Sequence, residues 1–429
     1  MQLAIWLVVC AIITFISVRR PYASIIVTIL LFVFVPYVAG SLLTGGSTFH
    51  PASWLVFVTV GVTLLTKPQK IFHEIGRHPL AYMAIGFALV GMVGSSFVIN
   101  SIPTGRTLMV DVIIAPILFF MLIGIHLHDN PRGAILMRNV ILICGVIQVG
   151  ISLIGSFLGG PLFYVAQLST KYWFSTTGVT RALGTFDDPL TLALFLAACI
   201  PLLASIKRPS LQLALVVIFF SGILLTSSRT SLFLALLGVI YLMVRTRTSF
   251  TARLAIGVGA VVLVVIVFTT SIGTSVLTRL TTDDGGSSGA RNDAWSLFFQ
   301  IAHQFTIFGG GITSSYTVGL NGGLATSFES AIIMYSIDFG ILFAVVYFGV
   351  LAVLSLRGLG KGHLPGAGLS AAFVVGAVQT FSSVGSGTAA GMFMWMFAAI
   401  ATAKWLPSSI ESVEEPDVVS TPEATGVRA

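Results

Sequence analysis

Six Lys and Arg residues stand apart from the other cations of the sequence, and their chemistry suits an anionic ligand. They are Arg106, Lys171, Arg181, Arg229, Arg279 and Arg291. A guanidinium group stays charged at physiological pH and can donate two parallel hydrogen bonds to a phosphate or a carboxylate. Whether these cations can act together depends on the elements that position them.

The chain that carries them is built almost entirely from long apolar runs. Its 429 residues are 56% hydrophobic and only 9% charged, with a mean hydropathy of +1.00. Soluble domains carry about a quarter charged residues, so a soluble fold could not cover its surface with this composition. The sequence predicts an all-α, polytopic integral membrane protein. The net charge of +7 does not indicate nucleic acid, because the basic residues form short clusters between apolar runs.

We expect twelve or thirteen transmembrane helices, since a bilayer core requires about 20 apolar residues per helix. The runs lie near residues 2–18, 22–43, 51–66, 80–100, 106–127, 135–158, 187–206, 210–227, 231–244, 254–271, 327–355, 366–386 and 388–405. The last two are short and close together, which leaves the count open by one. Residues 1–405 then form a single transmembrane domain. Residues 406–429 are acidic and rich in Pro, Ser and Thr, and predict a disordered cytoplasmic tail.

Orientation follows from the placement of Lys and Arg, which favour the cytoplasmic side. Fifteen of the 22 lie on alternate connections: Arg19, Arg20, Lys67, Lys70, Arg77, Arg132, Arg138, Lys207, Arg208, Arg245, Arg247, Arg253, Arg357, Lys361 and Lys404. The other connections face outward and carry the six cations named first. An anionic ligand on the outer side would explain them. Extension toward the membrane interface, or pairing with Asp187, Asp188, Asp283, Asp284 or Asp293, is the alternative.

The outward side has two large loops, at 159–187 and 272–326. Asp187 and Asp188 precede a helix that begins with Pro189, so helix capping is their expected role. In the late loop, a helix on the outer membrane interface is predicted after Arg291, because its apolar residues share one face. Those residues are Trp295, Phe298, Phe299, Ile301, Ala302 and Phe305. Gly309-Gly310-Gly311 then predicts a sharp bend with free amides, which is a weak signal for an anion site.

Other kinds of chemistry have little support in the sequence. Cys10, Cys144 and Cys199 lie inside apolar runs and have no metal-ligand spacing, and no phosphate-binding loop or nucleophile motif is present. We therefore expect no metal and no cofactor. His303 is the one histidine of the late loop; it could be catalytic or could simply lie at the interface.

Four segments together resemble the O-antigen ligase and O-antigen polymerase family of bacterial membrane glycosyltransferases. They are Arg181-x-x-Gly184-x-Phe186, Ser228-Arg229 at a helix end, Arg291-x-x-x-Trp295 followed by Gly309-x-Gly311, and Glu329 followed by Asp338-x-Gly340. The resemblance covers residues 180–345; the first 160 residues match only as generic spans. The ligase branch typically has a histidine where this chain has Glu329, which favours a polymerase.

The resemblance implies a glycosyltransferase-C-like membrane fold in the bacterial plasma membrane and a role in assembling O-antigen, capsule or exopolysaccharide for the cell envelope. The donor would be a glycan on undecaprenyl pyrophosphate, and the acceptor a sugar hydroxyl on another glycan or lipid-linked chain. A flippase and a chain-length regulator would be partners. The active site would face outward, with the C-terminus in the cytoplasm.

The same resemblance suggests roles for individual residues. Arg181, Arg229 and Arg291 would hold the pyrophosphate, with Arg229 and Arg291 also counted as catalytic because charge develops on the leaving group. Glu329 would orient or deprotonate the acceptor; a structural salt bridge to one of the arginines is the alternative. Arg279, His303 and Lys171 are further candidates.

Two other classes of function stay open. A secondary transporter would bind its substrate near the bilayer midplane, with broken helices and internal repeats. The sequence shows no repeat, and its unusual charges gather at the outer surface. A receptor or scaffold is less well supported, because the cytoplasmic loops are short.

Overall fold

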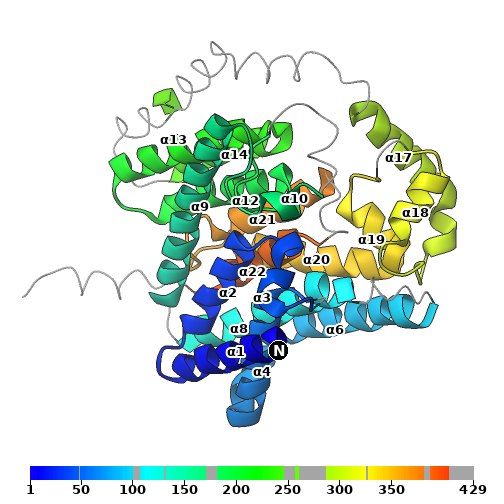
Figure 1. The fold of residues 1–429 in the computed structure, drawn as a ribbon, viewed down its shortest axis with the longest axis horizontal. Coiled ribbons are helices and arrows are strands. Elements are labelled where there is room, and N and C mark those ends of the chain that lie inside the picture. The colour runs from blue at the N-terminus through cyan, green and yellow to red at the C-terminus, as the bar shows by residue number, and fades with distance from the viewer. Residues whose placement is uncertain are drawn as a thin grey trace, which may run out of the picture.

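The described part of the chain is all-helical. The computed structural model describes residues 1–47, 49–99, 107–129, 132–170, 181–245, 257–259, 287–324, 327–380 and 387–404. Within these ranges it contains helices and turns and no β-strand (Figure 1). The predicted tail, 406–429, lies outside them. The all-α class is therefore confirmed for the described residues.

The helices follow the apolar runs of the sequence. The first half contains α1 (Gln2–Arg19), α2 (Ala23–Phe34), η1 (Tyr37–Ala39), α3 (Ser41–Thr44), α4 (Pro51–Thr66), α5 (Pro68–Arg77), α6 (Pro79–Gly94), η2 (Ser95–Ile99), η3 (Val110–Ile114), α8 (Ala115–Asp129), α9 (Arg132–Leu158) and α10 (Val165–Leu168). The second half contains α12 (Pro189–Leu202), η4 (Leu203–Ser205), α13 (Pro209–Thr226), α14 (Arg229–Arg245), α17 (Ser287–Ile301), η5 (Ala302–Phe305), α18 (Ser314–Asn321), α19 (Ala331–Phe339), α20 (Ile341–Arg357), α21 (Ala367–Ala377), η6 (Val378–Thr380) and α22 (Ala390–Thr402).

Five of these helices are long and apolar enough to cross a membrane, and up to seven spans result if each of two bent helix pairs is one span. Four shorter apolar helices add to them. Twelve of the thirteen predicted runs contain at least one helix. The thirteenth, 254–271, lies outside the described residues except for 257–259. The chain thus has the helices of a multi-pass membrane protein.

Two short helices, α12 and α22, are almost completely buried in the protein. Nearly every residue of α12 and α22 is buried, including Trp395. Helix α22 packs against α8, α20 and α21, and α12 packs against α13, α14 and α21. A helix that is apolar all round is stable where protein surrounds it on all sides. Protein, not lipid, therefore surrounds most of these two helices.

The second predicted run, 22–43, is not one straight helix. It breaks after α2 at Pro36, and η1 with α3 turns by 100° from α2. The freed backbone groups find side-chain partners: Asp187 accepts hydrogen bonds from Tyr37 N at 2.8 Å and Val38 N at 3.1 Å, and His50 Nε2 lies 2.9 Å from Val35 O. Such pairing is what permits a broken helix inside a membrane protein. Asp111, the buried acid of the fifth run, accepts from His50 N at 2.9 Å.

The predicted run 327–355 is also divided. Helix α19 ends at Phe339, and α20 begins after Gly340, which has a φ of 107°. A Cβ on Gly340 would lie 1.9 Å from the carbonyl oxygen of Ile307, so another chain segment crosses directly over the break. The single helix predicted here was wrong, because glycine permits a backbone conformation and an approach that no other residue could adopt.

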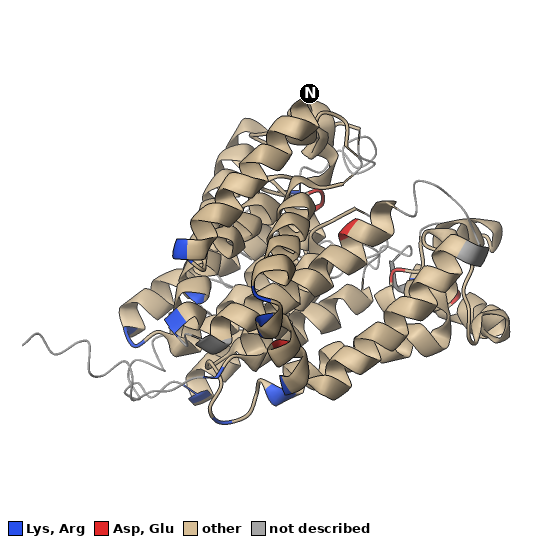
Figure 2. Cartoon of the chain, turned by 90° about the horizontal axis from the view of Figure 1, so that it is seen from below, with Lys and Arg blue, Asp and Glu red and all other residues tan. Residues whose placement is uncertain are grey.

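Most of the described cations lie at one end of the helix bundle, which we call the basic end. Figure 2 shows the blue segments of Lys and Arg gathered there. Arg19, Lys67 and Arg357 are the cations at the ends of α1, α4 and α20. Contacts tie these helix ends together: Tyr22 Oη donates to His126 O at 3.3 Å, and an isolated β-bridge joins His363 to Lys404. Segregation of this kind is typical of a membrane protein with a cytoplasmic basic face.

Helices α17, α18 and α19 form a separate layer beside α20 (Figure 1). The predicted amphipathic helix exists as α17 and η5, but its aromatic residues do not share one environment. Phe298 is buried against α19, whereas Trp295 is 43% and Phe299 is 70% exposed. Since α19 and α18 already cover one face, the exposed rings form a second apolar face of α17.

The crossing of residues 307–311 over the α19–α20 break gives a first prediction. A Cβ on Gly309 would lie 2.3 Å from the backbone carbon of Asp338, which has no room to move away. Gly309→Ala should therefore destabilise the protein by about 3 kcal/mol or more, seen as a lower thermal midpoint in detergent. Gly349→Ala is the matched control: its Cβ would meet nothing within 4 Å, and alanine favours a helix. Equal midpoints for the two variants would contradict the close crossing.

Candidate functional site

Two of the candidate arginines are positioned by the end of α13. Arg181 Nε donates to the carbonyl oxygen of Thr226 at 2.8 Å, and Ala182 N donates to Leu225 O at 3.1 Å. Ser227 then adopts a left-handed conformation with φ 54°, and Arg229 begins α14. This short turn connects α13 to α14. Arg181 and Arg229 are therefore placed by the same turn, at the end of the bundle opposite the basic end.

The segment 181–189 anchors this turn to the protein core. Gly184 has φ 61°, and Thr185 N donates to Gln148 Oε1 at 3.1 Å. Thr185 Oγ1 also donates to Val33 O at 2.8 Å, close to the break in α2. Phe186 is buried and lies against Phe195 and Phe393. The Arg-x-x-Gly-x-Phe spacing thus lets Arg181 bind the end of α13 while Phe186 packs in the core.

The two aspartates that follow have different roles. Asp188 caps α12: Oδ1 accepts from Thr191 N at 2.8 Å and Oδ2 from Thr191 Oγ1 at 2.7 Å. The capping prediction is confirmed for Asp188 and wrong for Asp187, which binds the amides of Tyr37 and Val38 instead. The amides freed by the break at Pro36 bind the Asp187 carboxylate, in place of the amides at the start of α12.

Gly184 offers a second prediction on the same segment. Its φ of 61° favours glycine, and a Cβ would lie 2.2 Å from Gln148 Oε1. Gly184→Ala should lower stability by about 2–4 kcal/mol, since it adds left-handed strain to overpacking. The matched control is Gly150→Ala on the same α9 that carries Gln148, where a Cβ meets nothing within 4 Å. Thermal unfolding in detergent should separate the two; a tolerated Gly184→Ala would contradict the contact with Gln148.

Arg291 and Glu329 form an ion pair at this same end. Arg291 Nε lies 3.3 Å from Glu329 Oε2, and its Nη2 donates to the carbonyl oxygen of Thr380 at 3.2 Å. The side chains are 43% and 23% exposed, respectively. A pair this exposed contributes only about 0–1 kcal/mol to stability. The contribution of the pair is therefore mainly positional. Arg291 joins α17 to the segment before α19 through Glu329 and to η6 through Thr380.

Glu329 is held in a conformation that few side chains adopt. Its φ is 47°, in the left-handed region, and α19 starts two residues later at Ala331. A non-glycine residue in this region costs about 1–2 kcal/mol. Residues of this kind gather at functional sites, where the surrounding structure holds them in place. The predicted helical position of Glu329 was wrong by these two residues; its carboxylate is in a loop at the helix entrance.

Helix η6 connects α21 to the α17–α19 layer. It continues α21, which packs against α12 and α14, and its Thr380 and Gln379 reach the α17–α19 layer. Gln379 Oε1 accepts from Ile332 N at 2.9 Å. Helix α13 runs from Pro209, next to Arg208, to the turn before Arg229. Helix α21 runs from beside Gly366, which lies against the carbonyl oxygen of Pro201, to η6, whose last residue contacts Arg291. The turn before Arg229 and the contact of Arg291 therefore lie at the ends of these helices that are away from Pro201 and Arg208.

The glycine-rich bend is not an anion site. Gly309 N donates to Ser95 Oγ at 3.2 Å, Gly310 N to Ile337 O at 2.8 Å and Gly311 N to Asp338 O at 2.8 Å. The amides that the sequence suggested were free are thus used inside the protein, since the bend packs on the end of α19. The three glycines are therefore explained by the packing of this bend, without an anion.

Asp338 has a structural role as well. Its side chain is fully buried and accepts hydrogen bonds from Thr313 N at 3.2 Å, Ser315 N at 2.7 Å and Ser314 Oγ at 3.1 Å. It caps the start of α18, which the sequence analysis did not foresee.

Of the remaining candidates, His303 is the one within the described residues. It is exposed in η5, and its backbone carbonyl oxygen accepts from Thr306 Oγ1 at 3.1 Å. Lys171, Arg279 and Arg106 lie outside the described residues. Thr380 and Gln379 were missed, because a backbone carbonyl and a lone glutamine at a helix end give no sequence signal that would single them out.

The arrangement can bind an anion with fixed cations and place a carboxylate beside it. Arg291 uses Nε and Nη2 in the contacts above, while Arg229 is exposed and makes no hydrogen bond or ion pair with the described residues. Among the described residues, no three His, Cys, Asp or Glu side chains are grouped as a metal site would require. A search of protein-family profiles and of curated proteins finds no match to this chain.

Proposed function

We propose that the protein is a membrane glycosyltransferase that moves a glycan from a lipid pyrophosphate to an acceptor sugar hydroxyl. The observation that carries the proposal is the Arg291–Glu329 pair, set opposite the basic end and in the same end of the bundle as Arg181 and Arg229. A polymerase of undecaprenyl-pyrophosphate-linked repeat units is favoured over a ligase. The reaction would take place at the outer face of a bacterial plasma membrane.

The chemistry assigns one task to each kind of group. The acceptor hydroxyl attacks the anomeric carbon of the donor, the bond from that carbon to the pyrophosphate oxygen breaks, and the hydroxyl proton passes to Glu329. Negative charge then develops on the leaving pyrophosphate. Guanidinium groups fixed beside it stabilise that charge without reorganising, which is usually the largest catalytic term. Arg181, Arg229 and Arg291 supply these groups.

The ion pair is compatible with both roles considered for Glu329. In the resting protein Arg291 neutralises a partly buried carboxylate. When the donor arrives, its pyrophosphate would compete for the Arg291 guanidinium, and Glu329 would be released toward the acceptor. Binding of the donor and activation of the base would then be coupled through one side chain.

A secondary transporter is the second candidate, and the broken helices favour it. The breaks at Pro36 and at Gly340 are the kind of discontinuity on which transporters build substrate sites. In this protein, however, the amides freed at Pro36 are bound by Asp187, and those of the crossing segment bind α19. Structural partners therefore already occupy the groups that would bind a transported anion.

Reconstitution into liposomes distinguishes the two. The protein is supplied with an undecaprenyl-pyrophosphate oligosaccharide on its outward side, and products are analysed by mass spectrometry. A polymerase lengthens the lipid-linked chain, and a ligase moves the glycan to a different acceptor lipid. Appearance of the unchanged oligosaccharide in the opposite leaflet, with no new glycosidic bond, would replace the transferase proposal with transport.

A further inference from the structure

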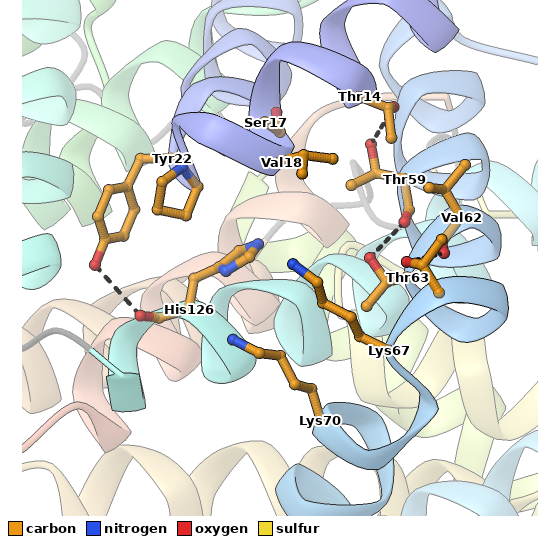
Figure 3. Close-up of a pocket in the computed structure, with 12 residues that line it drawn as sticks. Thr14, Ser17, Val18, Tyr22, Thr59, Val62, Thr63, Lys67, Lys70 and His126 are labelled. Atoms are coloured by element: carbon orange, nitrogen blue, oxygen red, sulfur yellow. Dashed lines mark hydrogen bonds between the residues drawn. The ribbon is translucent and has the colours of Figure 1, made fainter.

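A cavity at the basic end has a lining that the proposed function does not use. It has a volume of about 350 Å³ and lies between the ends of α1, α4 and α8 and the start of α5. The twelve residues that line it are Thr14, Ser17, Val18, Pro21, Tyr22, Thr59, Val62, Thr63, Thr66, Lys67, Lys70 and His126 (Figure 3). Its size is that of a ligand pocket.

The charge of the cavity is one-sided. Lys67 and Lys70 extend beside each other toward His126, from the connection between α4 and α5 (Figure 3). None of the twelve lining residues is acidic. Two ammonium groups that converge on a cavity attract an anion, and a phosphate is the anion for which lysine serves as a point charge.

The walls are suited to a lipid rather than to a free ion. The hydroxyl groups of Thr14 and Thr59 lie 3.1 Å apart in the lining. Thr59 is eight residues before Lys67, so these hydroxyls lie about 12 Å along the axis of α4 from the lysine. Beside the lysines, Val18 is 58% exposed and Leu65 is 85% exposed. The cavity thus joins a basic rim to exposed apolar side chains.

We propose that this cavity binds the phosphate head group of an anionic glycerophospholipid from the membrane leaflet at the basic end. Lys67 and Lys70 pair with the phosphate, and the acyl chains lie along the apolar faces of α1 and α4. Basic pockets between transmembrane helices on the cytoplasmic side bind lipid head groups in this way. The cavity lies at the opposite end from the proposed transfer site, so the two proposals stand or fall separately.

The test uses the purified full-length protein in detergent. Native mass spectrometry measures binding of dioleoyl phosphatidylglycerol, with dioleoyl phosphatidylcholine, a zwitterion of no net charge, as the comparison. The protein is expected to bind phosphatidylglycerol saturably and in preference to phosphatidylcholine. The double variant Lys67→Gln/Lys70→Gln should bind it about 10- to 30-fold more weakly, while Lys67→Arg/Lys70→Arg should retain most of the affinity.

Matched controls decide what the loss means. Lys361→Gln/Lys404→Gln removes the same charge from the same end of the bundle but outside the cavity, and should bind phosphatidylglycerol as the parent does. Equal weakening in the two double variants would reduce the effect to general attraction and overturn the proposal. Equal binding of phosphatidylcholine would also overturn it. Thermal protection by inorganic phosphate as large as that by phosphatidylglycerol would identify a soluble ion as the ligand instead.

Discussion

Arg291→Ala is expected to reduce glycan transfer by about a hundredfold to a thousandfold, the loss seen when one preorganised charge-stabilising donor is removed. The guanidinium of Arg291 lies 3.3 Å from Glu329 and 3.2 Å from Thr380 O, so it is held in place before substrate binds. Arg229→Ala should behave in the same way, because Arg229 is an exposed cation at the turn that also positions Arg181. The rate is measured with reconstituted protein and a lipid-pyrophosphate oligosaccharide at saturating acceptor.

The controls separate catalysis from structure. The amide nitrogen of Arg291→Gln takes the place of Nε, so this variant can still donate to Glu329 but carries no charge and does not reach Thr380 O. If the hydrogen bond to Glu329 is what matters, transfer should be near normal, whereas the charge role predicts a loss close to that of Arg291→Ala. Arg291→Lys keeps the charge but lacks the planar pair of guanidinium donors, so its transfer rate should lie between those of the parent and Arg291→Ala. Arg245→Ala, at the basic end, should leave transfer unchanged. Full activity in Arg291→Ala, with unaltered expression, would remove Arg291 from the site.

The helices of this protein could be predicted from the sequence, because the membrane imposes a simple rule. Runs of about 20 apolar residues must form helices whose backbone groups are satisfied internally. The N-cap at Asp188 was equally accessible, since an aspartate before Pro189 is a local signal. The distribution of cations along the chain predicted that these arginines lie away from the basic end.

The breaks in the helices were harder to predict. Pro36, inside the run 22–43, signals a break, yet where the freed amides would find a partner depends on Asp187, which lies 150 residues away in sequence from Tyr37. Gly340 was similar: its left-handed backbone is needed because residues 307–311 cross above it. Tertiary partners of this kind leave no pattern within a single run.

The residues of the candidate site also divide into those with a signal in the sequence and those without one. Arg181, Arg229, Arg291 and Glu329 were selected by residue type and by a resemblance, and each has a chemical group that the sequence displays. Thr380 contributes only a carbonyl oxygen, which every residue possesses. Its place in the site therefore becomes apparent only when α21 and α17 are assembled.

Glu329→Gln is expected to reduce transfer by about 10²–10⁴-fold, the usual contribution of a general base. The amide has almost the same shape as the carboxylate and can still accept a hydrogen bond from Arg291, but it cannot take the acceptor's proton. Binding of the lipid-pyrophosphate donor should be little changed, since the three arginines remain. Turnover and donor affinity are measured on the same reconstituted sample.

The left-handed backbone of Glu329 provides a second variant that makes the test decisive. Glycine accepts a φ of 47° without strain, so Glu329→Gly should leave the thermal midpoint unchanged or raise it slightly, recovering about 1 kcal/mol of strain. A residue kept only for structure would then be replaceable by glycine without loss of transfer. We expect the reverse, a stable and inactive protein. Such a result would mean that the strain at Glu329 is retained for its carboxylate, whereas active Glu329→Gly would leave Glu329 as the structural partner of Arg291.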